Sequence, residues 1–138
     1  MIKKLKNHHL IALSFGIVYL WFGALKFFPS WSPAETLATQ TIEILTFNYL
    51  KNTISIKALA LWETTIGLLF ILNWFRKTTI VLTLIHMILT LTTVFLLPEQ
   101  LFNQIPHQLT LFGQYVIKNL ILIAALIALY KHPSTSVL

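Results

Sequence analysis

Four long apolar segments, separated by shorter and more polar stretches, dominate the hydropathy pattern of the chain. They cover about residues 9–28, 54–74, 78–97 and 112–130. Each is close to the ~20 residues that an α-helix needs to cross the hydrocarbon core of a bilayer. A helix also satisfies its own backbone hydrogen bonds in lipid. The pattern therefore predicts an all-α integral membrane protein, in which four transmembrane helices form one domain over residues 1–138.

The two loops on one side of the predicted bundle differ in their residue patterns. In the first, Ser32-Pro33-Ala34-Glu35 has the serine, proline and glutamate spacing of a capping box. The partly apolar residues that follow predict a short amphipathic helix, which we expect to lie against the membrane interface. The second loop, residues 98–111, contains two prolines and is expected to be irregular.

Composition supports the membrane interpretation and indicates an orientation. Of the 138 residues, 57% are hydrophobic and 10% are charged, whereas soluble domains carry about 25% charged residues. The formal net charge of +6 comes from basic residues at helix ends, which favours the lipid bilayer over nucleic acid as the partner. Because basic residues concentrate on cytoplasmic loops, both termini are expected in the cytoplasm. The residues that set this bias are Lys3, Lys4, Lys6, Arg76, Lys77 and Lys131.

The residue types present exclude several kinds of catalytic or metal site. The chain has no cysteine, which excludes disulfides, thiol redox pairs and cysteine-ligated metals. His86 is the one histidine in the middle of a predicted span, so a haem held by two histidines is not expected. No nucleophile–base pair or phosphate-binding loop is recognisable. We predict no catalytic residue, no metal site and no intrinsic cofactor.

Each predicted span carries a stripe of small or polar residues at helical spacing. Such residues usually mark the contacts between transmembrane helices. For the glycines and threonines, close packing and ordinary hydrogen bonds explain the pattern sufficiently. The stripes are Ala12, Gly16, Tyr19, Gly23 and Lys26 in the first span, Ala60, Glu63, Thr64 and Gly67 in the second, Thr79, Thr83, His86, Thr90 and Thr93 in the third, and Gln114, Lys118, Ile121, Ala125 and Ala128 in the fourth.

The ionisable residues within these stripes are the candidate functional groups. Glu63 lies near the middle of its span, and a lone charge there costs ~2.5–3.5 kcal/mol on insertion scales. By depth, Lys118 is its expected partner, and Lys26 with Glu99 is a second expected pair. The cluster is either a ligand or proton site in the outer half of the bundle or a set of charges that fixes helix register.

His86 has two interpretations as well. It is expected to form a hydrogen bond to Thr83 or Thr90 between the helices. Alternatively, it relays protons together with Glu63 along the helix contacts.

Four runs of residues resemble a known family. They are WFGALKFFPSWSPAE, WETTIGLLF, LLPE and GQYVIKNLILIAALI, and together they resemble the DoxX-like membrane proteins and the related reactive-chlorine-resistance membrane proteins. The resemblance covers about residues 11–130 and implies a four-helix protein of the bacterial inner membrane. The matched positions are Trp21, Gly23, Lys26, Pro29, Glu63, Gly67, Pro98, Glu99, Gln114, Tyr115, Lys118 and Asn119.

The resemblance implies a role in redox chemistry without catalysis by this chain. Some relatives are described as the membrane subunit of a thiosulfate:quinone oxidoreductase or as partners in oxidative-stress complexes. We therefore expect a non-catalytic subunit that binds a quinone in an outer-half pocket and works with a redox partner subunit or as a homo-oligomer. The alternatives are a transporter of small molecules or protons and a structural or assembly protein. The expected pocket residues are Trp21, Lys26, Glu63, Glu99, Gln114, Tyr115, Lys118 and Asn119.

Overall fold

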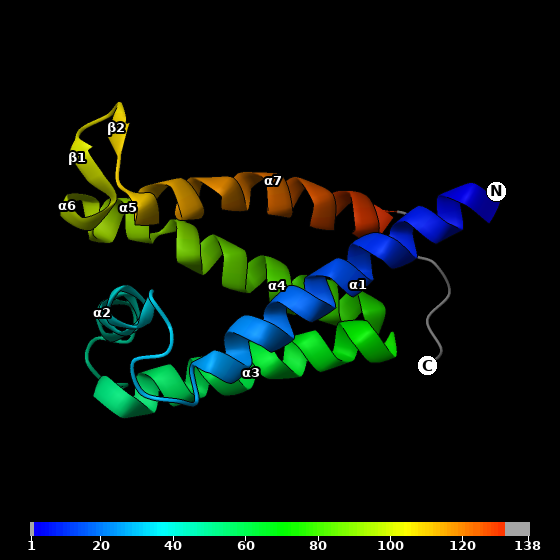
Figure 1. Ribbon diagram of the computed structural model, residues 1–138, viewed down its shortest axis with the longest axis horizontal. Helices are drawn as coiled ribbons and strands as arrows, with labels where there is room; N and C mark the ends of the chain where they lie inside the picture. The colour runs from blue at the N-terminus through cyan, green and yellow to red at the C-terminus, as the bar shows by residue number, and fades with distance from the viewer. Residues whose placement is uncertain (1, 132–138) are drawn as a thin grey trace.

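Helices account for nearly all of the structure. The computed structural model describes residues 2–131, and the side chains of residues 8–131. Four long helices run side by side as a bundle (Figure 1). Each contains a segment that is long and apolar enough to cross a membrane, which confirms the predicted all-α bundle and identifies a multi-pass membrane protein. These helices are α1 (Ile2–Leu25), α3 (Asn52–Leu72), α4 (Arg76–Leu91, continued by the short α5, Thr93–Leu96) and α7 (Leu111–Lys131).

The four helices pack as two pairs, α1 with α3 and α4 with α7. The first pair is the closer one because glycines lie where its backbones meet. A Cβ atom at Gly67 would lie 2.5 Å from the backbone nitrogen of Leu20, and one at Gly23 would lie 2.7 Å from the backbone nitrogen of Thr64. No larger residue fits at those distances, and such close contact of small residues is a usual means of helix association in lipid.

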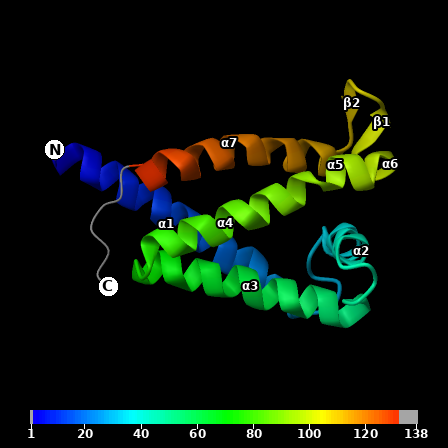
Figure 2. The ribbon, with the colours of Figure 1, turned by 180° about the vertical axis from the view of Figure 1, so that it is seen from behind.

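The two ends of the bundle differ in their structure (Figure 2). Residue 2 and residue 131 lie at one end, here called the termini end. The opposite end, here called the α2 end, carries the helices α2 (Glu35–Leu45) and α6 (Pro98–Leu101) and the strands β1 (Phe102–Gln104) and β2 (Gln108–Leu109). An even number of crossings places the two described ends on the same side of a membrane.

The first loop contains the predicted helix but not the predicted cap. Helix α2 begins at Glu35, after Ala34, and no side chain caps it. The backbone N–H of Glu35 instead donates to the backbone carbonyl of Ser32 in a tight turn. The Glu35 carboxylate reaches back to accept a hydrogen bond from the backbone N–H of Ser30, at 2.8 Å. The capping-box prediction is wrong because this turn displaces the helix start beyond Pro33.

The second loop is more regular than expected. Pro98 occupies the first turn of α6, and β1 and β2 then form a short antiparallel hairpin with Phe102 opposite Leu109. The backbone N–H of Thr110 donates to the carbonyl of Leu101 at 2.9 Å, which closes the loop where α7 begins. The two prolines therefore border regular elements and do not prevent them from forming.

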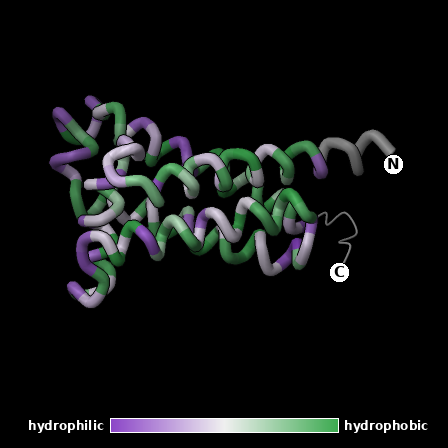
Figure 3. Tube along the Cα trace, turned by 60° about the horizontal axis from the view of Figure 1, so that its bottom comes forward, coloured by the Kyte–Doolittle hydropathy of each residue, from purple (hydrophilic) through white to green (hydrophobic). Residues whose placement is uncertain are grey.

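Hydrophobic residues cover the long helices, and hydrophilic ones gather at the α2 end (Figure 3). Inside the bundle, one apolar cluster fills the termini half and contains Ala12, Phe15, Ile66, Phe70, Ile80, Leu126 and Leu129, with Tyr19 and Met87 at its border with the middle of the bundle. A second apolar cluster joins α2 to the other helices at the α2 end through Leu37, Leu97, Leu101 and Val116. The buried polar side chains of the candidate site, described below, lie between these two clusters.

Candidate functional site

The helices α1, α3 and α4, with the turn that follows α1, bring four polar side chains together near the middle of the bundle. Lys26 Nζ lies 2.6 Å from Glu63 Oε2, and the other carboxylate oxygen, Glu63 Oε1, lies 3.4 Å from His86 Nε2. His86 Nδ1 is hydrogen-bonded to the Tyr19 hydroxyl at 2.8 Å. We call Tyr19, Lys26, Glu63 and His86 the central network. It joins α1, α3 and α4 and links the two helix pairs.

Burial explains why these charges pair. Lys26 and Glu63 are 8% and 7% exposed, and Glu63 is the twelfth of the 21 residues of α3. An unpaired charge at the centre of a transmembrane helix is expensive, so such residues pair inside a bundle. Lys26 also approaches the backbone carbonyl of Phe22 at 3.4 Å. The ion pair holds the ammonium group against α3, and the contact with Phe22 ties it to α1.

The donor and acceptor roles of the network follow from its geometry. A carboxylate without a proton only accepts hydrogen bonds, so the His86 nitrogen that faces Glu63, Nε2, carries the hydrogen. The other nitrogen, Nδ1, then accepts from the Tyr19 hydroxyl. Lys26 donates to the second oxygen of the same carboxylate. The four side chains thus form a continuous series of polar contacts. Two hydrogen bonds, Lys26–Glu63 and Tyr19–His86, are joined by the 3.4 Å approach of His86 Nε2 to Glu63 Oε1.

The predicted stripes of the first three spans face the interior, and that of the fourth does not. In the first span, Ala12, Gly16, Tyr19, Gly23 and Lys26 are all buried. In α7, Gln114, Lys118, Ile121 and Ala128 are exposed, and Ala125 is half-buried. The residues of α7 that are buried are Gly113, Val116, Leu126 and Leu129. The predicted face of the fourth span is therefore wrong, because the apolar residues all around α7 give no signal of which side packs.

This rotation of α7 changes the predicted ion pairs. Lys118 is exposed and does not pair with Glu63; its Nζ lies 5.5 Å from the centre of the Tyr115 ring. Glu99 is exposed and does not pair with Lys26. Both pairing predictions are wrong because α1 packs directly on α3, which brings Lys26, the residue after α1, against Glu63.

Most of the other predicted pocket residues lie outside the central network. Gln114 is exposed, and Tyr115 and Trp21 are 59% and 67% exposed. Asn119 is half-buried on α7. Of the predicted pocket, the structure brings together Lys26 and Glu63.

The predicted partner of His86 is also different. Thr83 is buried and donates to the backbone carbonyl of Thr79 at 2.7 Å, within its own helix. Thr90 donates to the backbone carbonyl of His86 at 2.9 Å and does not contact the imidazole. The ring instead meets Tyr19, which the stripe pattern placed inside the bundle but which was not predicted as a site residue. Its position seven residues before Lys26, on the same helix face, is the signal that could have identified it.

A polar cavity of about 440 Å³ adjoins the network at the α2 end. It lies between the end of α1, the helix α2 and the start of α3, and Lys26 forms part of its wall. Its lining is Lys26, Phe27, Pro29, Glu35, Thr36, Thr39, Gln40, Glu43, Asn52, Thr53, Ile56 and Lys57. Sequence reasoning missed this cavity, although Glu35, Thr39 and Glu43 recur every four residues and therefore share one face of α2.

Hydrogen bonds to the backbone hold two carboxylates of the cavity in place. Glu35 accepts from the Ser30 N–H through Oε2 at 2.8 Å, and Glu43 accepts from the Asn52 N–H through Oε1 at 2.9 Å. Each group therefore has one carboxylate oxygen left for other partners. The cavity carries charges of both signs at the end of the bundle, next to the buried pair.

No metal site was predicted, and within residues 2–131 no group of three or more histidine, aspartate or glutamate side chains is arranged to hold a metal ion. The arrangement can bind a polar group in the cavity and hold or pass a proton in the network. Comparisons of the chain with protein-family models, with curated proteins and with solved structures find no match.

Proposed function

We propose that the chain is a DoxX-like protein of the bacterial inner membrane and a non-catalytic subunit of a quinone-linked redox or oxidative-stress system. The observation that supports this most is the meeting of the polar cavity and the central network at Lys26. A ligand in the cavity would contact a charged donor whose counter-ion, Glu63, is already in place.

The chemistry of a quinone head group suits this arrangement. Its carbonyl oxygens accept hydrogen bonds, which the Lys26 ammonium group can donate. Reduction to a quinol adds protons as well as electrons, and the network supplies groups that hold protons. The chain has no cysteine, so the electrons would come from a redox partner subunit. The resemblance of the runs around Lys26 and Glu63 to DoxX-like proteins supports the same assignment.

The proposed orientation places the termini end in the cytoplasm. Arg76, Lys77 and Lys131 lie at this end, and the lysines of the first residues of α1 add to the bias. The cavity at the α2 end would then open on the opposite side of the membrane. A partner subunit that reaches the cavity would dock on that side.

Binding of a short-chain quinone to the purified protein tests the proposal. Lys26→Met is expected to weaken binding by more than about tenfold, because a hydrogen bond to a charged group contributes about 1.5–3 kcal/mol. Glu63→Gln is expected to weaken binding as well, because it removes the carboxylate that holds the Lys26 ammonium group. Lys118→Met is the matched control, since it removes a lysine of a span that lies outside the network. Unchanged affinity in both network variants, at wild-type folding, would refute the pocket.

A proton pathway is the second candidate, and the continuous series of polar contacts in the central network favours it. The apolar cluster in the termini half opposes it, because this cluster interrupts any polar path across the membrane. A flux assay in proteoliposomes separates the two functions, since a quinone-binding subunit would conduct no protons. A structural or assembly protein would show neither quinone binding nor flux.

A further inference from the structure

We infer that the central network exchanges protons with the α2 end of the protein and is closed to the termini end. This inference goes beyond the proposed function, because it concerns proton access and holds whether or not the ligand is a quinone. It rests on three features: the cavity that reaches Lys26, the apolar cluster beyond His86 and Tyr19, and a buried arginine at the termini end.

Access from the α2 end follows from the position of Lys26. Lys26 lines the cavity, and its Nζ lies 2.6 Å from Glu63 Oε2. Glu63 itself does not line the cavity, so a proton reaches it through the ammonium group. The carboxylates of Glu35 and Glu43 line the same cavity and favour the arrival of positive charge.

The transfer balances as two proton steps. In the first, an N–H bond of the Lys26 ammonium breaks as an O–H bond forms on the Glu63 carboxylate, which leaves a neutral amine and a neutral acid. In the second, the amine takes a proton from a hydronium ion in the cavity and releases water. The result is one additional proton on Glu63 and a restored charge on Lys26; release runs the same steps in reverse.

The groups that face Glu63 come from three helices. Tyr19 belongs to α1, Lys26 directly follows that helix, and His86 belongs to α4. Thr64, the neighbour of Glu63 on α3, is neutral. Among the described residues of α7, the titratable side chains of Tyr115, Lys118, Tyr130 and Lys131 are all exposed, so none joins the network. Proton uptake at Glu63 therefore concerns only the four side chains of the central network.

Towards the termini end, the polar series stops. Tyr19 and Met87, the residue after His86, belong to the apolar cluster, in which Ile66, Ile80 and Leu126 are at most 1% exposed. The two threonines of α4 in this region do not extend the series, because the hydroxyls of Thr79 and Thr83 donate to backbone carbonyls at the start of α4 and just before it. A proton would have to cross this segment without a hydrogen-bonding partner.

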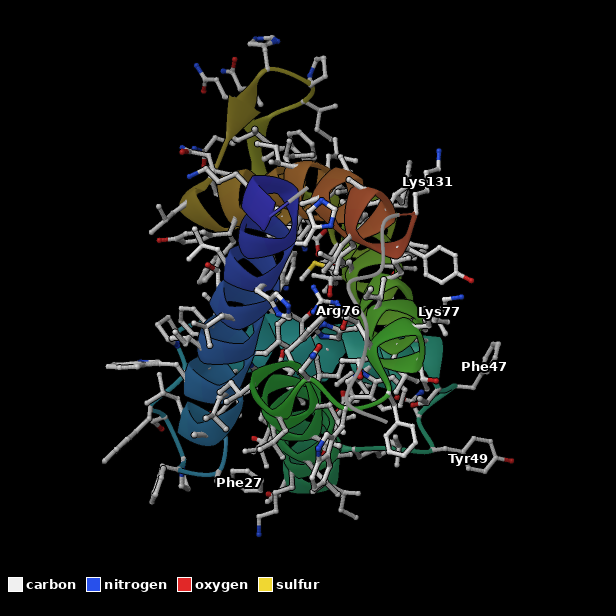
Figure 4. All side chains as sticks on the ribbon, turned by 90° about the vertical axis from the view of Figure 1, so that its right-hand side faces the viewer. Phe27, Phe47, Tyr49, Arg76, Lys77 and Lys131 are labelled. Carbon is white, nitrogen blue, oxygen red and sulfur yellow. The ribbon has the colours of Figure 1, made fainter. Side chains whose placement is uncertain are left out.

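A buried positive charge lies beyond the apolar cluster. Arg76 is 3% exposed; its guanidinium donates to Asn73 Oδ1 and to the backbone carbonyl of His8, both at 2.8 Å. Viewed along the bundle from the termini end, Arg76 lies near the middle, whereas Lys77 and Lys131 lie towards the edge (Figure 4). A fixed arginine repels an incoming proton, as arginines do in pores that exclude cations.

Infrared spectroscopy on oriented proteoliposomes tests the inference. The wild-type protein is reconstituted with one orientation, verified by protease removal of a terminal tag, and the pH is stepped on one face with an impermeant buffer. The probe is the carboxyl band of protonated Glu63. We expect this band to respond more than about fiftyfold faster to a pH step on the α2 face than to one on the termini face. A proton from the termini face would have to cross the apolar cluster, where an unpaired charge is costly.

Controls assign the signal. All four acidic residues of the chain are glutamates, so the band must be assigned to one of them. Glu63→Gln should remove the carboxyl band whose rate differs between the two faces. Glu99→Gln, which changes an exposed glutamate, should leave that band unchanged. Lys26→Met should slow the response from the α2 face. The comparison of the two faces uses the wild-type protein, so it decides the inference even where a variant does not fold.

Three outcomes would overturn the inference. Equal rates from both faces, or a faster response from the termini face, would mean a path across the apolar cluster. No response from either face would mean that the network is sealed. Failure of the proposed function looks different, because loss of quinone binding leaves the one-sided proton response intact.

Discussion

Helices α1 and α7 carry stripes of small and polar residues at the same spacing, but only the stripe of α1 faces the interior. Tyr19 and Lys26 are 5% and 8% exposed, whereas Tyr115 and Ile121 on α7 are 59% and 71% exposed. Helix α1 meets α3 at glycines that allow its backbone to approach closely. Helix α7 instead packs through Leu126 and Leu129. The difference teaches that a polar stripe predicts a buried face only where the partner helix supplies complementary groups.

The two lysines show the energetic side of this comparison. Lys26 is held by a carboxylate inside the bundle, where its charge would otherwise be costly. Lys118 is exposed beside the Tyr115 ring and, as a long side chain, can direct its charge towards the membrane interface. Substitutions on the buried stripe should therefore matter, and equivalent substitutions on the exposed stripe should not.

The largest effect is expected at the buried ion pair. Glu63→Gln leaves the Lys26 ammonium without its counter-ion, and breaking a buried pair in this way costs about 3–5 kcal/mol in unfolding free energy. Lys118→Met should change stability by less than ~0.5 kcal/mol. Unfolding in mixed micelles, followed by circular dichroism, measures both. Similar values for the two variants would contradict the distinction between the stripes.

Removing both charges should restore most of that loss. In Lys26→Met with Glu63→Gln no unpaired charge remains, and neutral replacement of a buried pair is often without net cost. The double variant should therefore be at least about 2 kcal/mol more stable than Glu63→Gln alone. A double variant as unstable as the single one would mean that Glu63 acts through something other than the ion pair.

A glycine substitution should give the next largest effect. Gly67→Ala places a Cβ atom within 2.5 Å of the Leu20 backbone nitrogen and forces α1 and α3 apart, at a cost of about 1–3 kcal/mol. Ala128→Val on the exposed side of α7 adds more atoms but should have little effect. The same unfolding assay compares the two. A neutral Gly67→Ala would mean that the helix pair has room to separate.

Removal of the tyrosine hydroxyl should have a smaller effect. Tyr19→Phe deletes the 2.8 Å hydrogen bond to His86, and such bonds between transmembrane helices average about 0.6 kcal/mol. Tyr115→Phe on the exposed stripe serves as the control and should be neutral. Loss of several kcal/mol in Tyr19→Phe would indicate that the whole network depends on this one bond.

The smallest effect is expected at a buried threonine. Thr83 is fully buried, but its hydroxyl bonds the backbone carbonyl of Thr79 in the same helix. Thr83→Val keeps the shape and should change stability by less than ~0.5 kcal/mol. A small effect would show that a buried polar side chain can lie inside the bundle without bonding another helix. A large loss would show that the hydroxyl has a role between helices.

Much of the fold could be predicted from the hydropathy pattern. The predicted spans of about 54–74, 78–97 and 112–130 correspond to the segments Asn52–Leu72, Arg76–Leu96 and Leu111–Lys131. Helix α1 ends at Leu25, three residues before the predicted end, because Lys26, Phe27 and Phe28 already lie in tight turns. Span length is predictable because the thickness of the hydrocarbon core sets it.

The candidate site was predictable only in part. The insertion cost of a charge identified Glu63 and Lys26 as groups that need partners, but depth alone paired them with Lys118 and Glu99. The cavity could not be predicted, since it depends on how α2 folds back across the ends of α1 and α3. Tyr19 had to be seen beside His86 before its role was apparent.

By itself, the sequence determined that the chain crosses a membrane with four helices and that some intramembrane charges must be paired. Both follow from the cost of exposing backbone and charge to lipid, which depends on residue type and length. Only the tertiary structure decided that Lys26 is the partner of Glu63 and that the polar stripe of α7 faces outward. Those facts depend on how each helix is rotated about its own axis. Hydropathy does not fix the rotation of a helix such as α7, which has apolar residues on all sides. The rotation of α1 is fixed by its close backbone contacts with α3.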